Sequence, residues 1–418
     1  MADRLVAAPA RLARRAARLF GYWRSERRTL RQGIAALALS TVAGFVAGLV
    51  LGAITGTLEA LPGLLVLIPA AVGMRGNIMG AIGARLGTGV AAGLFEPSLR
   101  RGGVLANNVE VGLLSAVLSS LYLAAIAKPV AAAFGERTIS FWDLVTISVV
   151  GGTLASAVIL VVTIGLAVQS FRRGWDLDAV ATPIITALGD MVTLPSLFVA
   201  SLIARHESAT LATAIACLVV AAIALVRAVR WSPSPVRRIL LEMAGVLALA
   251  PLLDILAGAL LELHRSRLEA MAGLLILIPP FVSQAGALGG ILSSRLTSKL
   301  QLGVITPRGR PEIPAIVDGS IVVVLGLVIF GVIGTVAWGL SVALGQPHPP
   351  GGTMIGGTVL AGLLVLPLTL VCGYYLAVLT ARFGLDPDNH GVPIITSMMD
   401  LAGVAAILLV MRTSGVLA

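Results

Sequence analysis

Two short stretches of this chain have nearly the same sequence. The first is Pro183-Ile184-Ile185-Thr186-Ala187-Leu188-Gly189-Asp190, and the second, 210 residues later, is Pro393-Ile394-Ile395-Thr396-Ser397-Met398-Met399-Asp400. The segments 59–69 and 269–279 share this offset, and each begins with glutamate and ends with proline. One constant offset over this much sequence indicates an internal duplication. The chain is therefore predicted to hold two copies of one unit, each with one aspartate inside an apolar segment.

The composition is typical of a membrane protein. Hydrophobic residues make up 57% of the 418 residues, charged residues make up 12%, and the mean hydropathy is +0.99. A soluble chain of this length needs far more polar surface, whereas apolar runs of about 20 residues are long enough to cross a bilayer. The 47 glycines suit close helix packing in lipid. Cys217 and Cys372 both lie in apolar runs, so no disulfide framework is expected.

The apolar runs predict an all-α polytopic membrane protein with about eleven spans. Each copy holds five runs, and one extra run joins the copies. Directly fused copies of five spans would face opposite ways, so the extra helix makes the two pseudo-symmetric five-helix repeats parallel. The second span is expected to be broken, because it holds Pro62, Pro69 and the glycine-rich run 73–77. The predicted spans are 33–57, 61–83, 104–127, 141–168, 180–203, 209–229, 239–262, 271–293, 312–344, 353–381 and 391–411.

Charge placement predicts the topology. Most of the 30 lysines and arginines fall in the N-terminal segment or in loops on its side of the membrane, which places the N-terminus in the cytoplasm and the C-terminus outside. An integral protein of the plasma (inner) membrane is expected. The net charge of +10 is assigned to these basic segments and the lipid surface, with no nucleic acid as a partner. The predicted divisions are a basic amphipathic segment over 1–32, a first repeat over 33–204, a linker with one transmembrane helix over 205–238, and a second repeat over 239–418.

Asp190 and Asp400 are the leading candidates for chemistry. Each lies about ten residues into its predicted span, which at roughly 1.5 Å per residue is about 15 Å, near the middle of the membrane. A lone carboxylate at that depth is costly unless it meets water or a partner. Thr186 and Thr396 lie four residues earlier, on the same helix face as the aspartates. The alternative is a structural or protonated pair of acids.

Further candidates lie on the second span of each copy and at the membrane faces. Gly76 allows close backbone approach, and Asn77 offers a carbonyl oxygen, while Gln284 stands near the equivalent position in the second copy. Arg75 is a cation within a span, and Asp254 is its candidate partner. Glycine-rich packing and solvated loop charges are the alternatives. The acids or amides that could concentrate cations at the outer mouth or at an inner site are Glu59, Glu269, Asn108, Asp318, Asp176, Asp178, Asp386 and Asp388.

These motifs resemble a known family. Pro-x-x-Thr-x-x-x-Asp on the last span of a five-span unit, with a Pro…Gly-Asn element on the second, is similar to the membrane domain of MgtE-type magnesium transporters. The tandem form resembles solute carrier family 41, whose basic-Gly-Asn pattern matches the residues 75–77. The resemblance covers roughly 33–412 and implies Mg²⁺ binding by Asp190 and Asp400, in a path lined by Gly76 and Asn77. No segment resembles the cytoplasmic sensor domains of the MgtE channel, so gating by such domains is not expected.

The sequence therefore predicts a transporter and not an enzyme. Its expected cargo is a hydrated divalent cation, magnesium above all, since the aspartate motifs carry oxygen ligands without cysteine or histidine. Channel-like flow and exchange coupled to Na⁺ or H⁺ both remain open. The alternative is a carrier of an organic or anionic solute that uses Arg75 as counter-charge. An intramembrane enzyme would be expected to show clustered acids such as Asp-x-x-Asp. One chain holds both copies and so could suffice, although a homodimer is compatible with the sequence.

Overall fold

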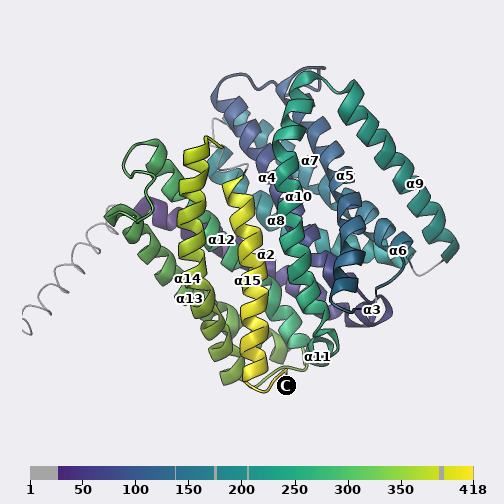
Figure 1. The fold of residues 1–418 in the computed structure, drawn as a ribbon, viewed down its shortest axis with the longest axis vertical. Helices are drawn as coiled ribbons and strands as arrows, with labels where there is room; N and C mark the ends of the chain where they lie inside the picture. The colour runs from purple at the N-terminus through teal and green to yellow at the C-terminus, as the bar shows by residue number, and fades with distance from the viewer. Residues whose placement is uncertain (1–26, 137, 174–176, 205–206, 386–389, 418) are drawn as a thin grey trace, which may run out of the picture.

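The computed structural model describes residues 27–136, 138–173, 177–204, 207–385 and 390–417, and these residues form helices joined by short loops (Figure 1). Eleven helical segments are long and apolar enough to cross a membrane, and they coincide with the eleven predicted spans. The all-α polytopic fold is confirmed. The helices of the first half are α2 (Arg27–Ala53), α3 (Thr55–Ala60), α4 (Leu64–Ala91), α5 (Val104–Ala133), α6 (Phe141–Thr146), the π-helical turn η1 (Ile147–Gly151), α7 (Gly152–Arg173) and α8 (Leu177–Ile203).

The second half repeats this order after one joining helix. That helix is α9 (Glu207–Val226), which continues into the π-helical turn η2 (Arg227–Trp231) and lies at the outer edge of the molecule, beside α5 and α6 (Figure 1). The remaining helices are α10 (Ser234–Glu262), α11 (Arg265–Ala270), α12 (Ala272–Gln301), α13 (Ile313–Ala343), α14 (Gly351–Phe383) and α15 (Gly391–Thr413).

Local sequence explains where several helices begin. The helix α6 starts at a capping box, in which the Ser140 side chain and the Asp143 side chain each accept a hydrogen bond from the other residue's backbone N–H. The short helix α3 is followed by Gly63, whose φ of 87° lets the chain turn back into α4. These devices reverse the chain at the ends of the membrane-crossing helices.

The first helix of each repeat packs against the second long helix of the other repeat. Helix α2 packs against α12 of the other half, and α10 packs against α4. A glycine at equivalent positions of the two repeats makes both contacts close. A Cβ at Gly48 would clash with the carbonyl oxygen of Ile276, and a Cβ at Gly258 would clash with the carbonyl oxygen of Val66. The centre of the molecule therefore consists of α2, α4, α8, α10, α12 and α15, while α5, α7 and α9 flank one side and α13 and α14 flank the other (Figure 1).

The expected break in the second span is wrong. Helix α4 runs without interruption from Leu64 to Ala91. Helix α12 is also uninterrupted, although Pro279 and Pro280 lie inside it. Pro69 removes one backbone donor, yet the helix continues because transmembrane helices packed on all sides tolerate proline. The Gly76-Asn77 pair is thus presented by a continuous helix and not by an unwound segment.

Candidate functional site

Asp190 lies on α8 at the interface between the two repeats. Its Oδ2 accepts a hydrogen bond of 2.8 Å from the hydroxyl of Ser283, which belongs to α12 of the other half. Ser283 lies 2.9 Å from the hydroxyl of Ser40 on α2. The side chain of Asp190 is partly exposed. A carboxylate from one repeat is therefore held by a hydroxyl of the other repeat, which in turn contacts a hydroxyl on α2. No local pattern in the sequence singles out either serine.

Asp400 occupies the equivalent place on α15. A Cβ on Gly286 of α12 would lie 3.3 Å from its Oδ1, so this glycine leaves the carboxylate room. Asp400 is partly exposed and is close enough to interact electrostatically with both Asp190 and Asp254. The duplicated aspartates therefore face the same central region. In the part of the chain that the structure describes, no three His, Cys, Asp or Glu side chains are gathered tightly enough to hold one metal ion.

The two threonines of the repeated motif differ in their surroundings. Thr396 is partly exposed, and its hydroxyl donates to the backbone carbonyls of Val392 (3.1 Å) and Pro393 (2.9 Å) on its own helix. Thr186 is exposed. Both lie one turn before their aspartate, as the spacing predicts, and their role in a path remains a prediction.

Helix α4 meets α8 next to the candidate Gly-Asn pair. A Cβ on Gly189 would lie 3.6 Å from the backbone nitrogen of Gly76, so the residue before Asp190 touches this element. Asn77 is partly exposed, while its buried Nδ2 has no hydrogen-bond partner among the described residues. Gln284 is fully buried and donates from Nε2 to the carbonyl of Leu37 on α2 at 2.9 Å. Its Oε1 is buried without a partner among the described residues.

Arg75 does not pair with Asp254. Its buried guanidinium donates to the carbonyl oxygens of Ala71 (3.1 Å) and Gly152 (3.4 Å) and to the hydroxyl of Ser120. These groups are all neutral and belong to α4, α7 and α5. The proposed ion pair is wrong because the guanidinium turns toward α5 and α7 of the first repeat and away from α10, which carries Asp254. Asp254 on α10 instead faces Gly73 of α4.

Glu59 and Glu269 come close together at one end of the helical assembly. Glu59 is exposed. Glu269 forms a 3.9 Å ion pair with Arg265, which also lies 3.3 Å from Glu262 at the end of α10. Burial raises the pKa of Glu269, the positive charge of Arg265 opposes this, and the negative charge of Glu59 adds to it. This end of the molecule therefore carries a cluster of mixed charge.

The inner candidates are already engaged. Asp318 is fully buried and accepts hydrogen bonds from Arg295 (2.7 Å) and Lys299 (2.5 Å), which ties α12 to α13. Asn108 donates to the carbonyl of Val104 at 2.9 Å. These contacts favour a structural role over an inner cation site. Three of the other inner candidates lie outside the described residues: Asp176, Asp386 and Asp388. The side chain of Asp178 also lies outside the described part of the structure.

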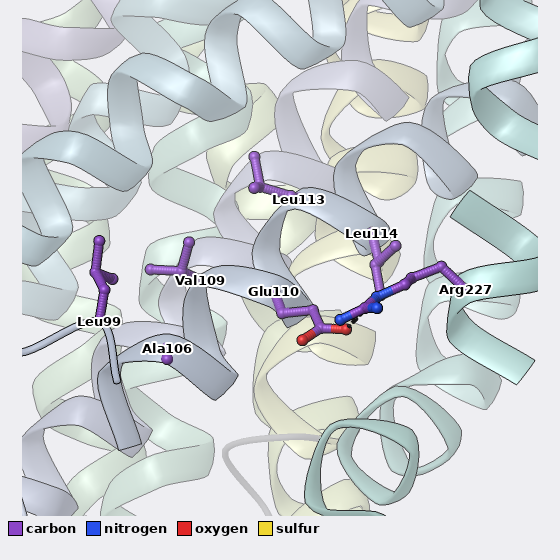
Figure 2. A pocket seen from close by; sticks show the side chains of 7 residues that line it. All are labelled: Leu99, Ala106, Val109, Glu110, Leu113, Leu114 and Arg227. Carbon is purple, nitrogen blue, oxygen red and sulfur yellow. Dashed lines mark hydrogen bonds and ion pairs between the residues drawn. The ribbon is translucent and has the colours of Figure 1, made fainter. Parts of the chain in front are cut away.

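One open hollow lies away from the aspartates. It is lined by residues of α5 with Leu99 and Arg227, and Figure 2 shows Glu110 and Arg227 pointing toward each other across it. These two side chains form a 3.0 Å ion pair, and the hydroxyl of Ser232 donates to the same carboxylate at 2.8 Å. The carboxylate is therefore already neutralised, and this hollow is a weaker candidate than the central region.

Comparison with known proteins places the chain in a family. The family model described as "MgtE: Divalent cation transporter" matches residues 68–200 and again residues 278–410. The chain belongs to the MgtE family of divalent cation transporters. The two matched segments are separated by the offset of the internal duplication and together cover more than half of the chain. This is a family of transporters, not enzymes, so that prediction is confirmed.

Curated relatives of this MgtE-family chain are members of solute carrier family 41. Member 2 from Gallus gallus is 29% identical over 132 residues, 31% of this chain and 23% of the relative. Member 3 from Rattus norvegicus is 28% identical over 159 residues, 37% of this chain and 34% of the relative. The match thus spans about a third or less of each relative's length. No solved structure matches the chain.

Proposed function

We propose that this protein moves Mg²⁺ across a membrane along a path between its two repeats, with Asp190 and Asp400 binding the cation. The observation that carries the proposal is the position of the two aspartates against one helix: Ser283 of α12 donates to the carboxylate of Asp190, and Gly286, three residues later on α12, faces the carboxylate of Asp400. Two carboxylates supplied by duplicated motifs balance the two charges of one divalent cation. Family membership supports the divalent class of the cargo.

The ligand chemistry supports magnesium among divalent cations. Mg²⁺ prefers oxygen ligands and keeps several of its water molecules when a protein binds it. The described groups next to the aspartates are the hydroxyl of Ser283, which also contacts that of Ser40, and the glycine Gly286 of α12, while Gly76 of α4 packs against the residue before Asp190. Zinc and copper sites would instead be expected to use cysteine or histidine. Partly exposed aspartates suit a cation that retains water.

The proposal includes the topology and the assembly. The N-terminus lies in the cytoplasm, the C-terminus lies outside, and the protein resides in the plasma (inner) membrane. One chain suffices, since it carries both halves of the site. The alternative of an organic or anionic solute as cargo, with Arg75 as its counter-charge, loses its support because Arg75 faces neutral oxygens of the first repeat.

The test is Mg²⁺ flux into liposomes that hold purified protein. Wild type is compared with Asp190→Asn and Asp400→Asn, and Glu110→Gln serves as a matched control because that carboxylate is already paired with Arg227. We expect flux from wild type and the control, and a loss of at least about tenfold in each aspartate variant, because affinity falls with the number of carboxylate ligands. Runs with and without Na⁺ or pH gradients separate exchange from channel-like flow. Wild-type flux in both aspartate variants would overturn the site.

A further inference from the structure

Asp254 is a buried carboxylate that the duplication does not explain. It lies on α10 with no exposed surface, and neither of its oxygens has a hydrogen-bond partner among the described residues. The residue at the equivalent position of the first repeat is Gly44. A charged group without a partner is costly inside a membrane, and such groups mark ion or substrate pathways. In its ionised form, Asp254 would therefore need a positive charge that the described contacts do not provide.

The space for Asp254 comes from a glycine that is a serine in the other half. A Cβ on Gly73 would lie 2.6 Å from Oδ2 of Asp254. The residue equivalent to Gly73 is Ser283, whose hydroxyl binds Asp190. One half of the centre thus combines Gly44 with Ser283, and the other combines Asp254 with Gly73. The two differences compensate for each other. The space beside the second helix of the repeat holds the Ser283 hydroxyl in one half and the Asp254 carboxylate in the other.

A second polar group points to the same place. Ser397 of α15 is 1% exposed, and its hydroxyl lies close enough to interact with the Asp254 carboxylate, although no hydrogen bond of standard geometry joins it to any described residue. Its equivalent in the first repeat is Ala187. A buried carboxylate and a buried hydroxyl, both present only in the second half, therefore lie beside Asp400, since α10 packs against α15 and Ser397 stands three residues before Asp400 on that helix.

The charged groups around Asp254 leave its charge unbalanced. Asp400 on α15 and Asp190 on α8 are both negative, and Arg75 on α4 is turned toward α5 and α7. A cation between Asp254 and Asp400 would meet two carboxylates and a hydroxyl, an all-oxygen set of the kind that suits a hard divalent cation. No other described side chain supplies that positive charge.

We infer that Asp254, Asp400 and Ser397 form a second cation-binding position that is present only in the second half of the path. This inference rests on the proposed function, since the cation is the transported one. The position next to Asp190 holds the cation with one carboxylate and hydroxyl groups, and the position next to Asp400 holds it with two carboxylates. Asp254 is thus a ligand of the path and not a structural acid.

The test combines equilibrium binding with flux. Mn²⁺ binding to purified protein is measured by electron paramagnetic resonance, and Mg²⁺ flux is measured in liposomes over a range of Mg²⁺ concentrations. The variants are Asp254→Asn and the double change Gly73→Ser/Asp254→Gly, which copies the arrangement of the first half and fills the space if the single variant fails to fold. Glu110→Gln is the control. We expect weaker Mn²⁺ binding and a half-saturating Mg²⁺ concentration raised by about tenfold or more, since ligand charge sets affinity.

The outcomes separate this inference from the proposed function. Wild-type Mn²⁺ affinity and Mg²⁺ dependence in both variants would overturn the inference and leave the transport proposal standing. A change confined to the response to a proton gradient, with Mn²⁺ affinity unchanged, would also overturn it, because Asp254 would then carry a proton. Mn²⁺ binding that is weakened in the Asp254 variants, together with no Mg²⁺ flux from wild type, would support the binding site and refute the transport proposal.

Discussion

Replacing Arg75 separates the effect of a buried charge from the effect of a buried volume. The guanidinium is fully buried and meets only neutral oxygens. An apolar residue of similar size removes the desolvation cost of a charge that has no ionic partner, so the exchange should be neutral or stabilising. Alanine leaves a cavity, and large-to-alanine changes at buried positions typically cost about 2–5 kcal/mol. We therefore expect Arg75→Met to retain or raise stability and Arg75→Ala to lower it clearly.

The second repeat supplies a natural control for this experiment. The residues equivalent to Ala71, Arg75 and Ser120 are Phe281, Ala285 and Phe330, and the two phenylalanine rings pack with their centroids 4.9 Å apart. Gly152, which faces Arg75, and Gly362, which faces Phe330, are also equivalent positions. A Cβ on Gly152 would clash with the Arg75 side chain, and a Cβ on Gly362 would clash with the Phe330 ring. One repeat thus fills this space with a guanidinium, and the other fills it with aromatic rings.

The control variant is Ala71→Phe/Arg75→Ala/Ser120→Phe, which copies the second repeat. Since it restores the buried volume, its stability should lie within about 1.5 kcal/mol of wild type. Thermal unfolding in detergent, followed by size-exclusion chromatography, measures the stability of all four proteins, and liposome flux measures their transport. Equal destabilisation of Arg75→Met and Arg75→Ala would show that the charge itself is needed. A folded triple variant without flux would place Arg75 in the path and refute our assignment.

Three further predictions concern packing and charge. Gly258→Ala should lower stability by about 1–3 kcal/mol through its clash with the carbonyl of Val66, whereas Gly165→Ala, which meets no atom within 4 Å, should be neutral or stabilising in the same thermal assay. Asp318→Asn should cost about 1–3 kcal/mol, because two cations lose their buried partner. Glu269 has a raised pKa, so the folded state disfavours its ionised form, and Glu269→Gln should therefore be the more stable protein at neutral pH. This advantage should shrink as the pH falls below the raised pKa and should vanish below the ordinary glutamate pKa.

The sequence was sufficient for the architecture because the relevant signals are local or periodic. Apolar length defines a membrane-crossing helix, and each of the eleven runs corresponds to a helical segment of the described residues that is long enough to cross a membrane. The constant offset between Asp190 and Asp400 placed both aspartates in equivalent helices. The expected break near Pro69 failed for a physical reason: a helix enclosed by other helices keeps its course through a proline, and no local signal reports that enclosure.

The partners of the aspartates could not be predicted, because they depend on how the repeats interlock. Ser283 lies 93 residues from Asp190 in the sequence, and a lone serine in an apolar helix carries no pattern. Arg75 was assigned to Asp254 because opposite charges in a membrane are expected to pair, yet α5 and α7 offer it enough neutral oxygens. One signal was available: aligning the two copies shows serine against glycine at 283 and 73, and aspartate against glycine at 254 and 44.

This complementary exchange explains what a fused duplication permits. In a symmetric pair of identical chains, each substitution at the centre would occur twice, and a second carboxylate would add two charges at once. Within one chain, the half around Asp190 can keep a serine while the half around Asp400 gains Asp254. In the parallel arrangement that we propose, both halves lie at the same depth in the membrane. The added carboxylate therefore deepens the attraction for a cation at that depth without favouring either side, and its effect should fall on affinity and not on the direction of transport.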